Sequence, residues 1–218
     1  MAELYHLGVA TSLVPRLAVL VDPMLSTAPL VAATGGRQVA TRREYVNHLG
    51  LWDGQPVLVA TVGVGAPPLA IAVEELARAG MRAVVLMGTA TFVDVDTSWL
   101  LPHGAVRGDG TSAQYAPLAF PAVPDAGLRA RLADETGGHT SYGLVETVDV
   151  LDGASTSPMT IAARDLRCAA LFVVAAAKGV RAAAVLADAG PPDTTGGRTG
   201  HDMAEAVLRS LTATDIEE

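Results

Sequence analysis

The sequence predicts a three-layer α/β fold, with helices on both faces of a mostly parallel sheet. Short Val-rich runs, typical of strands buried on both faces, alternate with segments of helical periodicity. Hydrophobic residues make up 50% of the 218-residue chain and charged residues 17%, so the chain can bury a large core. This length lies between one and two average domains. Because no linker or internal repeat interrupts the chain, we expect one domain over residues 1–218.

Apolar runs bounded by turn residues predict the strands of this sheet, at Leu17–Val21, Arg37–Thr41, Tyr45–Trp52, Val57–Val62, Met81–Met87, Gly143–Val150 and Arg181–Ala187. Apolar residues at helical spacing predict helices at Leu69–Ala79, Ala126–Ala133, Leu166–Lys178 and Thr199–Leu211. Asp53-Gly54 is a hairpin signal, and Gly63-Val64-Gly65 forms a glycine turn between a strand and a helix. The stretch Thr91–Pro124 is rich in Gly, Pro and Asp, so we expect loops there, with a strand or two near Gly104–Arg107.

Composition excludes several classes of partner. The formal charge of -8 argues against a surface that tracks nucleic acid phosphates. The longest apolar run, Cys168–Ala177, is too short to span a bilayer, and the amino-terminal residues lack the pattern of a secretory signal. One cysteine, Cys168, excludes an internal disulfide and agrees with a cytoplasmic protein. We expect no cofactor and no metal, because the histidines have no ligand spacing, and we expect a small-molecule substrate.

Several motifs carry a family resemblance. They are Tyr5-His6-Leu7-Gly8, Asp22-Pro23, Arg43-Glu44, the long stretch Asp53–Ala90 and the stretch Val106–Asp125. Together they resemble the nucleoside phosphorylase family, in particular its uridine phosphorylase branch. The resemblance implies an α/β sandwich around a distorted mixed sheet, assembled as dimers or as hexamers built from dimers. It also implies cleavage of N-glycosidic bonds with phosphate.

The phosphate site implied by this resemblance has lost most of its ligands. The family places a glycine turn and an arginine after its first strand, whereas this chain has Val21 and Leu25 there. A second phosphate arginine of the family corresponds to Leu86. Apolar side chains supply neither the charge nor the paired donors of a guanidinium. Only Arg43 remains, which in the family reaches in from the neighbouring subunit.

The sugar and base sites implied by the resemblance are altered as well. Asp165-Leu166-Arg167 stands where the family has Glu-Met-Glu, so a cation that can only donate replaces a carboxylate that accepts hydrogen bonds from the sugar. The segment between Asp149 and Asp165 lacks the part that carries the uridine branch's base-reading residues. In the emptied pocket Asp149 and Arg167 could form a new pair, although both residue types often have solvated structural roles.

The candidate catalytic residues are Asp188, Thr89, His6 and Arg43. By resemblance, Thr89, His6 and Arg43 are retained from the family, whereas Asp188 is an acid that the uridine phosphorylase branch lacks. Asp188 matches a catalytic acid of purine nucleoside phosphorylases, while a loop cap is an equally good interpretation. Thr89 can donate into the cleft or simply end a strand. His6 can be an ordinary surface residue, and Arg43 an interface salt bridge with Glu44. The candidate substrate-binding residues are Val21, Gly63, Gly65, Leu86, Gly88, Asp149, Asp165 and Arg167.

Three functional hypotheses follow from this pattern. The first is a nucleoside phosphorylase-like enzyme repurposed for a reaction without phosphate, on a small and possibly cyclic molecule of bacterial specialised metabolism. Hydrolysis, elimination, isomerisation or cyclisation would all suit such a pocket. The second is continued cleavage of an N-glycosidic bond, as a phosphorylase or a nucleosidase. The third is a non-catalytic binding protein or partner subunit. Because His6 and Arg43 are retained, we expect a homodimer or a higher even oligomer.

Overall fold

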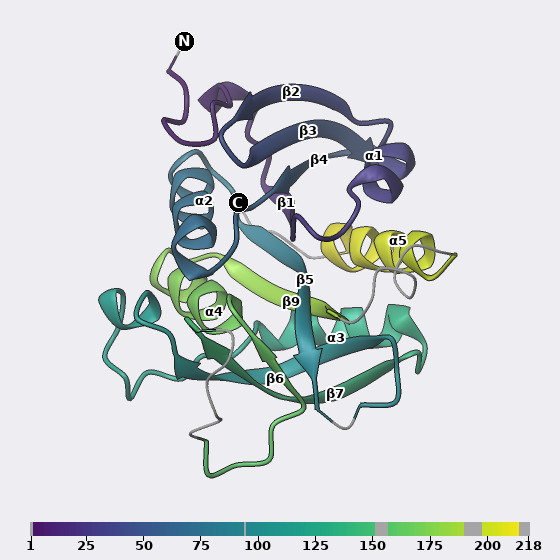
Figure 1. Ribbon diagram of the computed structural model, residues 1–218. Helices are drawn as coiled ribbons and strands as arrows, with labels where there is room; N and C mark the ends of the chain where they lie inside the picture. Colours follow the sequence, from purple (N-terminus) through teal and green to yellow (C-terminus); the bar gives the residue numbers. More distant parts are fainter. Residues whose placement is uncertain (1, 94, 151–156, 190–197, 214–218) are drawn as a thin grey trace.

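The computed structural model describes residues 2–93, 95–150, 157–189 and 198–213, with the side chains of residues 198 and 199 excepted (Figure 1). The strands are β1 (Leu17–Val21), β2 (Arg37–Arg42), β3 (Tyr45–Trp52), β4 (Gln55–Thr61), β5 (Ala83–Phe92), β6 (Trp99–Gly108), β7 (Thr140–Val148), β8 (Ala163–Asp165) and β9 (Arg181–Asp188). The helices are α1 (Ala28–Thr34), α2 (Ala66–Arg78), α3 (Ala126–Thr136), α4 (Cys168–Ala177) and α5 (Arg198–Thr212), with short 3-10 turns at Thr11–Leu13 and Ser112–Gln114.

These strands form one mixed, nine-stranded sheet in the order β2-β3-β4-β1-β5-β8-β7-β6-β9. The centre is parallel, because β1 pairs with both β4 and β5, and β5 pairs with β9. Strand β9 therefore contacts both β5 and β6, so the strands from β5 to β9 close into a small barrel-like ring. The antiparallel hairpins of β2, β3 and β4 extend the sheet on the other side.

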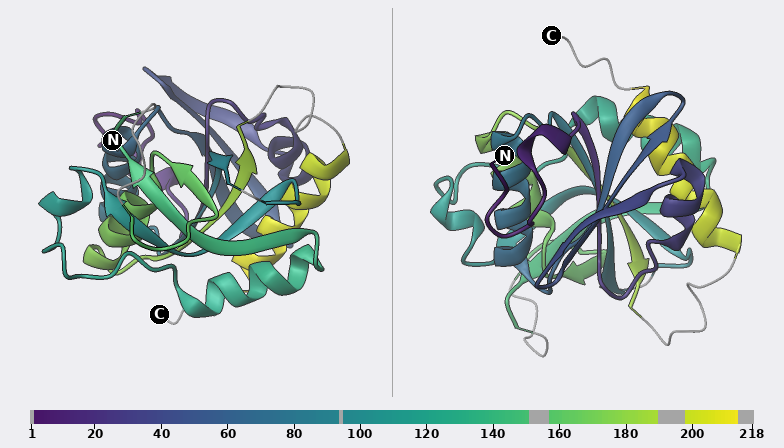
Figure 2. Two further views of the ribbon diagram at one scale, coloured as in Figure 1. Left: turned by 60° about the horizontal axis from the view of Figure 1, so that its bottom comes forward. Right: turned by 90° about the horizontal axis from the view of Figure 1, so that it is seen from above.

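Helices cover both faces of the sheet and define two core clusters (Figures 1 and 2). Alternation along β1 sends Ala18 and Leu20 to the cluster under α2 and α4, and Val19 and Val21 to the cluster under α1, α3 and α5. Helix α4 is apolar around its circumference, because it is buried between α2 and the sheet. The three-layer α/β class predicted from the sequence is confirmed.

Most predicted elements are present with shifted ends, and the expected loop between Thr91 and Pro124 contains the largest difference. Strand β5 continues to Phe92, because Thr91 and Phe92 pair with β8. Strand β6 is a full ten residues long where mainly loops were expected. Its irregular register between Pro102 and Gly104 breaks the alternation that would reveal a strand. The short elements α1 and β8 were not predicted.

The parallel centre of the sheet places several candidate residues at one edge. Asp22 directly follows β1, Gly63 lies just beyond β4, Thr89 lies in the last part of β5, and Asp188 ends β9. The carboxyl ends of neighbouring parallel strands meet at the same edge, where α/β proteins bind ligands. Within the described part of the chain, no helix is long and apolar enough to cross a membrane.

Candidate functional site

Asp22, Thr89 and Arg167 form a buried hydrogen-bonded cluster at this edge. Nη1 of Arg167 lies 2.5 Å from Oδ2 of Asp22, and the Thr89 hydroxyl donates to the same oxygen at 2.7 Å. The second carboxylate oxygen of Asp22 accepts the Met24 backbone N–H at 2.8 Å. Asp22 is only 1% exposed and Arg167 3%. The cluster therefore holds one carboxylate and one guanidinium out of water, with a combined charge of zero.

The glycine turn after β4 supplies the other partner of Arg167. Nε of Arg167 donates to the carbonyl oxygen of Gly63 at 3.3 Å. A Cβ on Gly63 would lie 2.8 Å from Cβ of Pro68 and 3.0 Å from Cγ of Glu44, so only glycine lets these groups approach. Gly63 thereby joins the cluster to the hairpin that carries Glu44.

Asp165 orients the start of α4 and so fixes the backbone of Arg167. Its Oδ2 accepts the N–H groups of Arg167 at 3.0 Å and Cys168 at 2.6 Å, and its Oδ1 accepts the Thr147 hydroxyl at 2.5 Å. Burial raises the pKa of Asp165, and the hydrogen bonds from Thr147, Cys168 and Arg167 oppose that rise. Both oxygens of Asp165 are occupied by these groups, so it acts through the position of Arg167.

The pair of Asp149 with Arg167, which the sequence left open as one alternative, does not form. Arg167 instead turns toward Asp22, because Gly63 and Asp22 together offer its guanidinium two buried acceptors. Asp149 accepts the backbone N–H of Gly110 at 2.8 Å through Oδ2. It therefore holds the loop that follows β6.

Asp188 stands on the strand next to Thr89. Residue pairing aligns Thr89 with Ala187 and Ala90 with Asp188. The Asp188 side chain is half-buried, and its Oδ1 accepts the Phe92 backbone N–H at 3.4 Å. Because Asp188 is paired with Ala90, it is a strand-end acid whose side chain points to the face of the sheet opposite to that of Thr89.

His6 and Arg43 lie apart from the cluster in this chain. His6 is held by Glu75 of α2, which accepts from its backbone N–H at 2.9 Å and contacts ring Nδ1 at 2.8 Å. Burial alone would raise the pKa of Glu75, but the hydrogen bonds from His6 and Leu7 hold it below the ordinary value. Arg43 is exposed at the tip of the β2–β3 hairpin, with a left-handed φ of 54°.

The remaining candidates belong to the frame of the site. Val21 and Leu86 are both 0% exposed and point into opposite core clusters, so neither presents its side chain to a ligand. Gly88 lets β5 pack closely, because a Cβ there would lie 2.9 Å from Cδ2 of Leu186. Gly65 precedes α2 in a conformation with φ of 89°, which favours glycine.

Sequence reasoning missed three contributors to this arrangement. Asp22 was identified only as part of a motif, yet it is the buried partner of Arg167. Thr147 braces Asp165, and its hydroxyl oxygen also accepts the Ala169 N–H at 2.9 Å. Glu75 anchors His6 from 69 residues away. No spacing rule links such partners, although a buried Glu in an apolar helix face is a signal that it has a partner.

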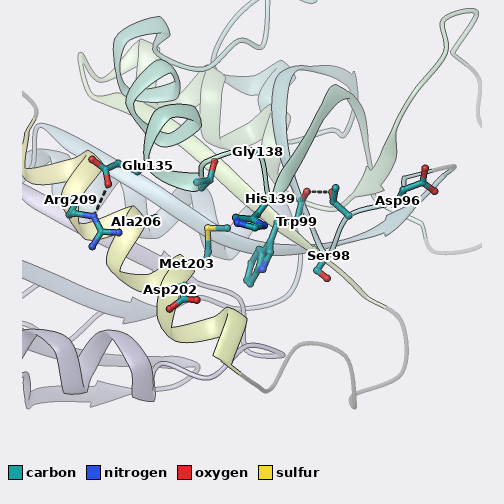
Figure 3. Close-up of a pocket in the computed structure, with 12 residues that line it drawn as sticks. Asp96, Ser98, Trp99, Glu135, Gly138, His139, Asp202, Met203, Ala206 and Arg209 are labelled. Atoms are coloured by element: carbon teal, nitrogen blue, oxygen red, sulfur yellow. Dashed lines mark hydrogen bonds and ion pairs between the residues drawn. The ribbon is translucent and has the colours of Figure 1, made fainter.

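Two cavities lie on the α5 side of the sheet, outside the cluster. The larger, of about 440 Å³, is lined by polar residues and by Trp99 and Met203; Figure 3 shows Asp202 and Met203 on α5 and the ion pair of Glu135 with Arg209. The second, of about 250 Å³, lies between α1 and α5. Trp99 lines both. Among the described residues, no group of three or more His, Cys, Asp and Glu side chains could hold a metal ion.

The cluster suits a neutral polar ligand better than a phosphate dianion. Its one guanidinium is already neutralised by Asp22, and Leu25 and Leu86 supply no charge. Binding a dianion would require its desolvation with little compensation. A ligand hydroxyl group, by contrast, can exchange hydrogen bonds with Thr89, which is the member of the cluster that is only half-buried.

Comparisons with known proteins give a consistent result. The family model described as the Phosphorylase superfamily matches residues 7–213. Uridine phosphorylase of Treponema pallidum is 32% identical over 207 residues, which cover 84% of this chain and 80% of that protein. Guanosine phosphorylase of Halorubrum lacusprofundi is 30% identical over 159 residues, covering 67% of this chain and 66% of that protein. The crystal structure of uridine phosphorylase from Vibrio fischeri, 22% identical, superposes with a TM-score of 0.84 and covers 98% of this chain and 99% of its own.

Proposed function

This chain belongs to the phosphorylase superfamily, and we propose that it cleaves the N-glycosidic bond of a nucleoside. The observation that carries the proposal is the hydrogen bond of 2.7 Å from Thr89 to Asp22 at the carboxyl ends of β5 and β1. Relatives named for uridine and guanosine phosphorolysis support the reaction class. They favour it over the repurposed enzyme expected first from the missing arginines.

Water is the acceptor that the charges of the site favour. The cluster carries no net charge, so it gives little stabilisation to a phosphate dianion, whereas a water molecule needs no opposite charge in order to bind. In the proposed reaction the bond between C1′ and the base nitrogen breaks while the oxygen of water bonds to C1′. The carboxyl group of Asp188 gives a proton to the leaving nitrogen, and the proton lost by water restores it. The products are the free base and ribose.

The experiment measures release of free base from uridine, guanosine and inosine by liquid chromatography. Thr89→Ala removes the hydroxyl that donates to Asp22, so we expect base release to fall at least about tenfold. Thr91→Ala is the matched control, because this exposed threonine lies on the same strand outside the cluster. It should change the rate less than twofold. No base release from any of the nucleosides by the wild-type protein would contradict the proposal, as would equal rates in the two variants.

A second candidate function is favoured by the buried guanidinium of Arg167. By resemblance, this residue stands where the family has its sugar-binding carboxylate. A donor-only group there suits a ligand with acceptors, such as a carbonyl compound, better than a ribose. The enzyme would then catalyse a non-phosphorolytic reaction on a small cyclic molecule. Release of free base by the wild-type protein distinguishes the two candidates. Base is released from a nucleoside if the site receives ribose, and none is released if it receives a carbonyl compound.

A further inference from the structure

The smaller of the two cavities is mainly apolar, unlike the cluster of Asp22, Thr89 and Arg167. Its walls are apolar and come from α1, β5, β6 and α5, with Leu25, Pro29, Leu30, Met87, Trp99 and Ala204 among them. Ser26 and His201 are the polar side chains that line it, apart from the indole N–H of Trp99. We refer to it as the apolar cavity. No carboxylate, lysine or arginine is among its described lining residues.

The apolar cavity lies on the same face of the sheet as Thr89. Met87 precedes Thr89 by two residues, so both side chains point to one face of β5, about 7 Å apart along the strand. The pairing of β5 with β9 and of β9 with β6 aligns Thr89, Ala187 and Trp99 in one row. Leu25 closes the other side, because its backbone N–H donates to the carbonyl oxygen of Asp22 at 2.9 Å. Thr89 therefore lies between the two, since it donates a hydrogen bond to Asp22 of the cluster and shares a face of β5 with Met87 of the cavity.

The volume and walls of the cavity select a chemical class. At about 250 Å³ it exceeds the ~150 Å³ apolar cavity that accepts benzene in a well-studied case. A charged group would lose its hydration against Leu25, Leu30 and Met87 without a partner of opposite charge. Burial of an aromatic ring against Trp99 and Met87 is favourable by contact area and by sulfur–aromatic contact.

We propose that the apolar cavity is a subsite for an uncharged, ring-sized apolar group of the ligand whose polar part binds at the Asp22–Thr89–Arg167 cluster. The inference rests on the proposed function only in taking that cluster as the substrate site. By resemblance, Leu25 stands where the family has a charged arginine. Its apolar side chain forms one wall of this subsite. The ligand is thus a nucleoside-like molecule that carries an apolar ring in addition to its sugar.

Binding is tested with nitrobenzene, an uncharged ring that quenches tryptophan fluorescence. The sequence has two tryptophans, so Trp52→Phe leaves Trp99 as the reporter. In that background we expect saturable quenching. Ala204→Leu fills the apolar cavity and should weaken binding at least tenfold. The matched control is Ala206→Leu, an equally buried alanine of α5 that lines the larger cavity instead; it should change the affinity less than twofold.

The following outcomes would contradict the proposal of an apolar subsite. Quenching that rises linearly with nitrobenzene would mean collision alone, and equal effects of the two alanine variants, or a larger effect of Ala206→Leu, would place the probe elsewhere. Leu25→Arg tests the same wall if Ala204→Leu does not fold, because Leu25 is half-buried and can direct a longer side chain to solvent. It should also weaken binding at least tenfold. Because no turnover is measured, failure here is separate from failure of base release.

Discussion

Arg167 and Asp22 are 145 residues apart in sequence and form an ion pair of 2.5 Å between two side chains that are both nearly fully buried. A pair of this kind gives little net stability against an apolar replacement, because both charges were desolvated on folding. Its loss on one side only is costly, since the remaining charge stays buried. The pair therefore fixes the geometry of the cluster and sets its charge to zero.

The first prediction concerns this pair. Arg167→Met leaves Asp22 buried without its cation, so the free energy of unfolding should fall by about 3–5 kcal/mol. Urea denaturation followed by circular dichroism measures the change. Arg78→Met, which removes an exposed partner of Glu74, is the control and should cost less than about 0.5 kcal/mol. The double variant Asp22→Asn with Arg167→Met should regain part of the loss; a double variant less stable than Arg167→Met would contradict a coupled pair.

The second prediction assigns the proton donor. Asp188→Asn keeps an oxygen that can accept the Phe92 N–H but removes the acid, so turnover of an identified nucleoside should fall about 10²-fold with little change in KM. Asp53→Asn is the control, because this hairpin residue has a φ of 47° that asparagine also adopts. Steady-state kinetics give both values. Unchanged turnover in Asp188→Asn would limit Asp188 to a structural contact with β5.

The third prediction follows from the lowered pKa of Glu75. A carboxyl whose pKa is lower in the folded state stabilises the protein above its unfolded value of 4.5, and this contribution is lost as pH falls through the folded value. Glu75→Gln should therefore cost roughly 1.5–3 kcal/mol at neutral pH and progressively less below pH 4.5. Urea denaturation at several pH values measures it, with the exposed Glu205→Gln as control. A pH-independent difference would show that the charge of Glu75 is not responsible.

The fourth prediction is that the protein is a homodimer. It follows from the retention of His6 and Arg43 in motifs that resemble those of the family. Tyr5 beside His6 is 72% exposed, as expected of an aromatic residue that a second copy covers. Light scattering should give twice the chain mass of 22.3 kDa, or an even multiple of it. Tyr5→Asp should lower that mass toward one chain. A wild-type protein that is monomeric at all concentrations would contradict the prediction.

The fold could be predicted from the sequence where local patterns and tertiary structure agree. The strand Tyr45–Trp52 was expected with the bounds that the structure has, because Asp53-Gly54 marks its end. Strand β6 could not be predicted as a whole, since Pro102 and the irregularity before Gly104 interrupt the period-two pattern. The short helix α1 depends on packing against α5 and β3, which no local pattern reports.

The candidate site could be predicted only in part, for a related reason. Thr89, Gly63 and Arg167 were identified by resemblance, and the structure joins them in one network. The pairing within that network depends on which acceptors β1 and β4 bring to Arg167. Sequence separation contains no information on this choice, so Asp149 could be named as one alternative partner and Asp22 was not considered.

The central claim is that the uncharged cluster favours water over phosphate as the acceptor in cleavage of the N-glycosidic bond. The most direct test is the identity of the sugar product, measured by mass spectrometry with and without phosphate in water enriched in ¹⁸O. Hydrolysis predicts ribose that carries one ¹⁸O, formed at a rate independent of phosphate. Ribose 1-phosphate, formed at a rate that rises with phosphate and saturates, would contradict the assignment of water as acceptor and show that the Asp22–Thr89–Arg167 cluster accommodates the dianion after all.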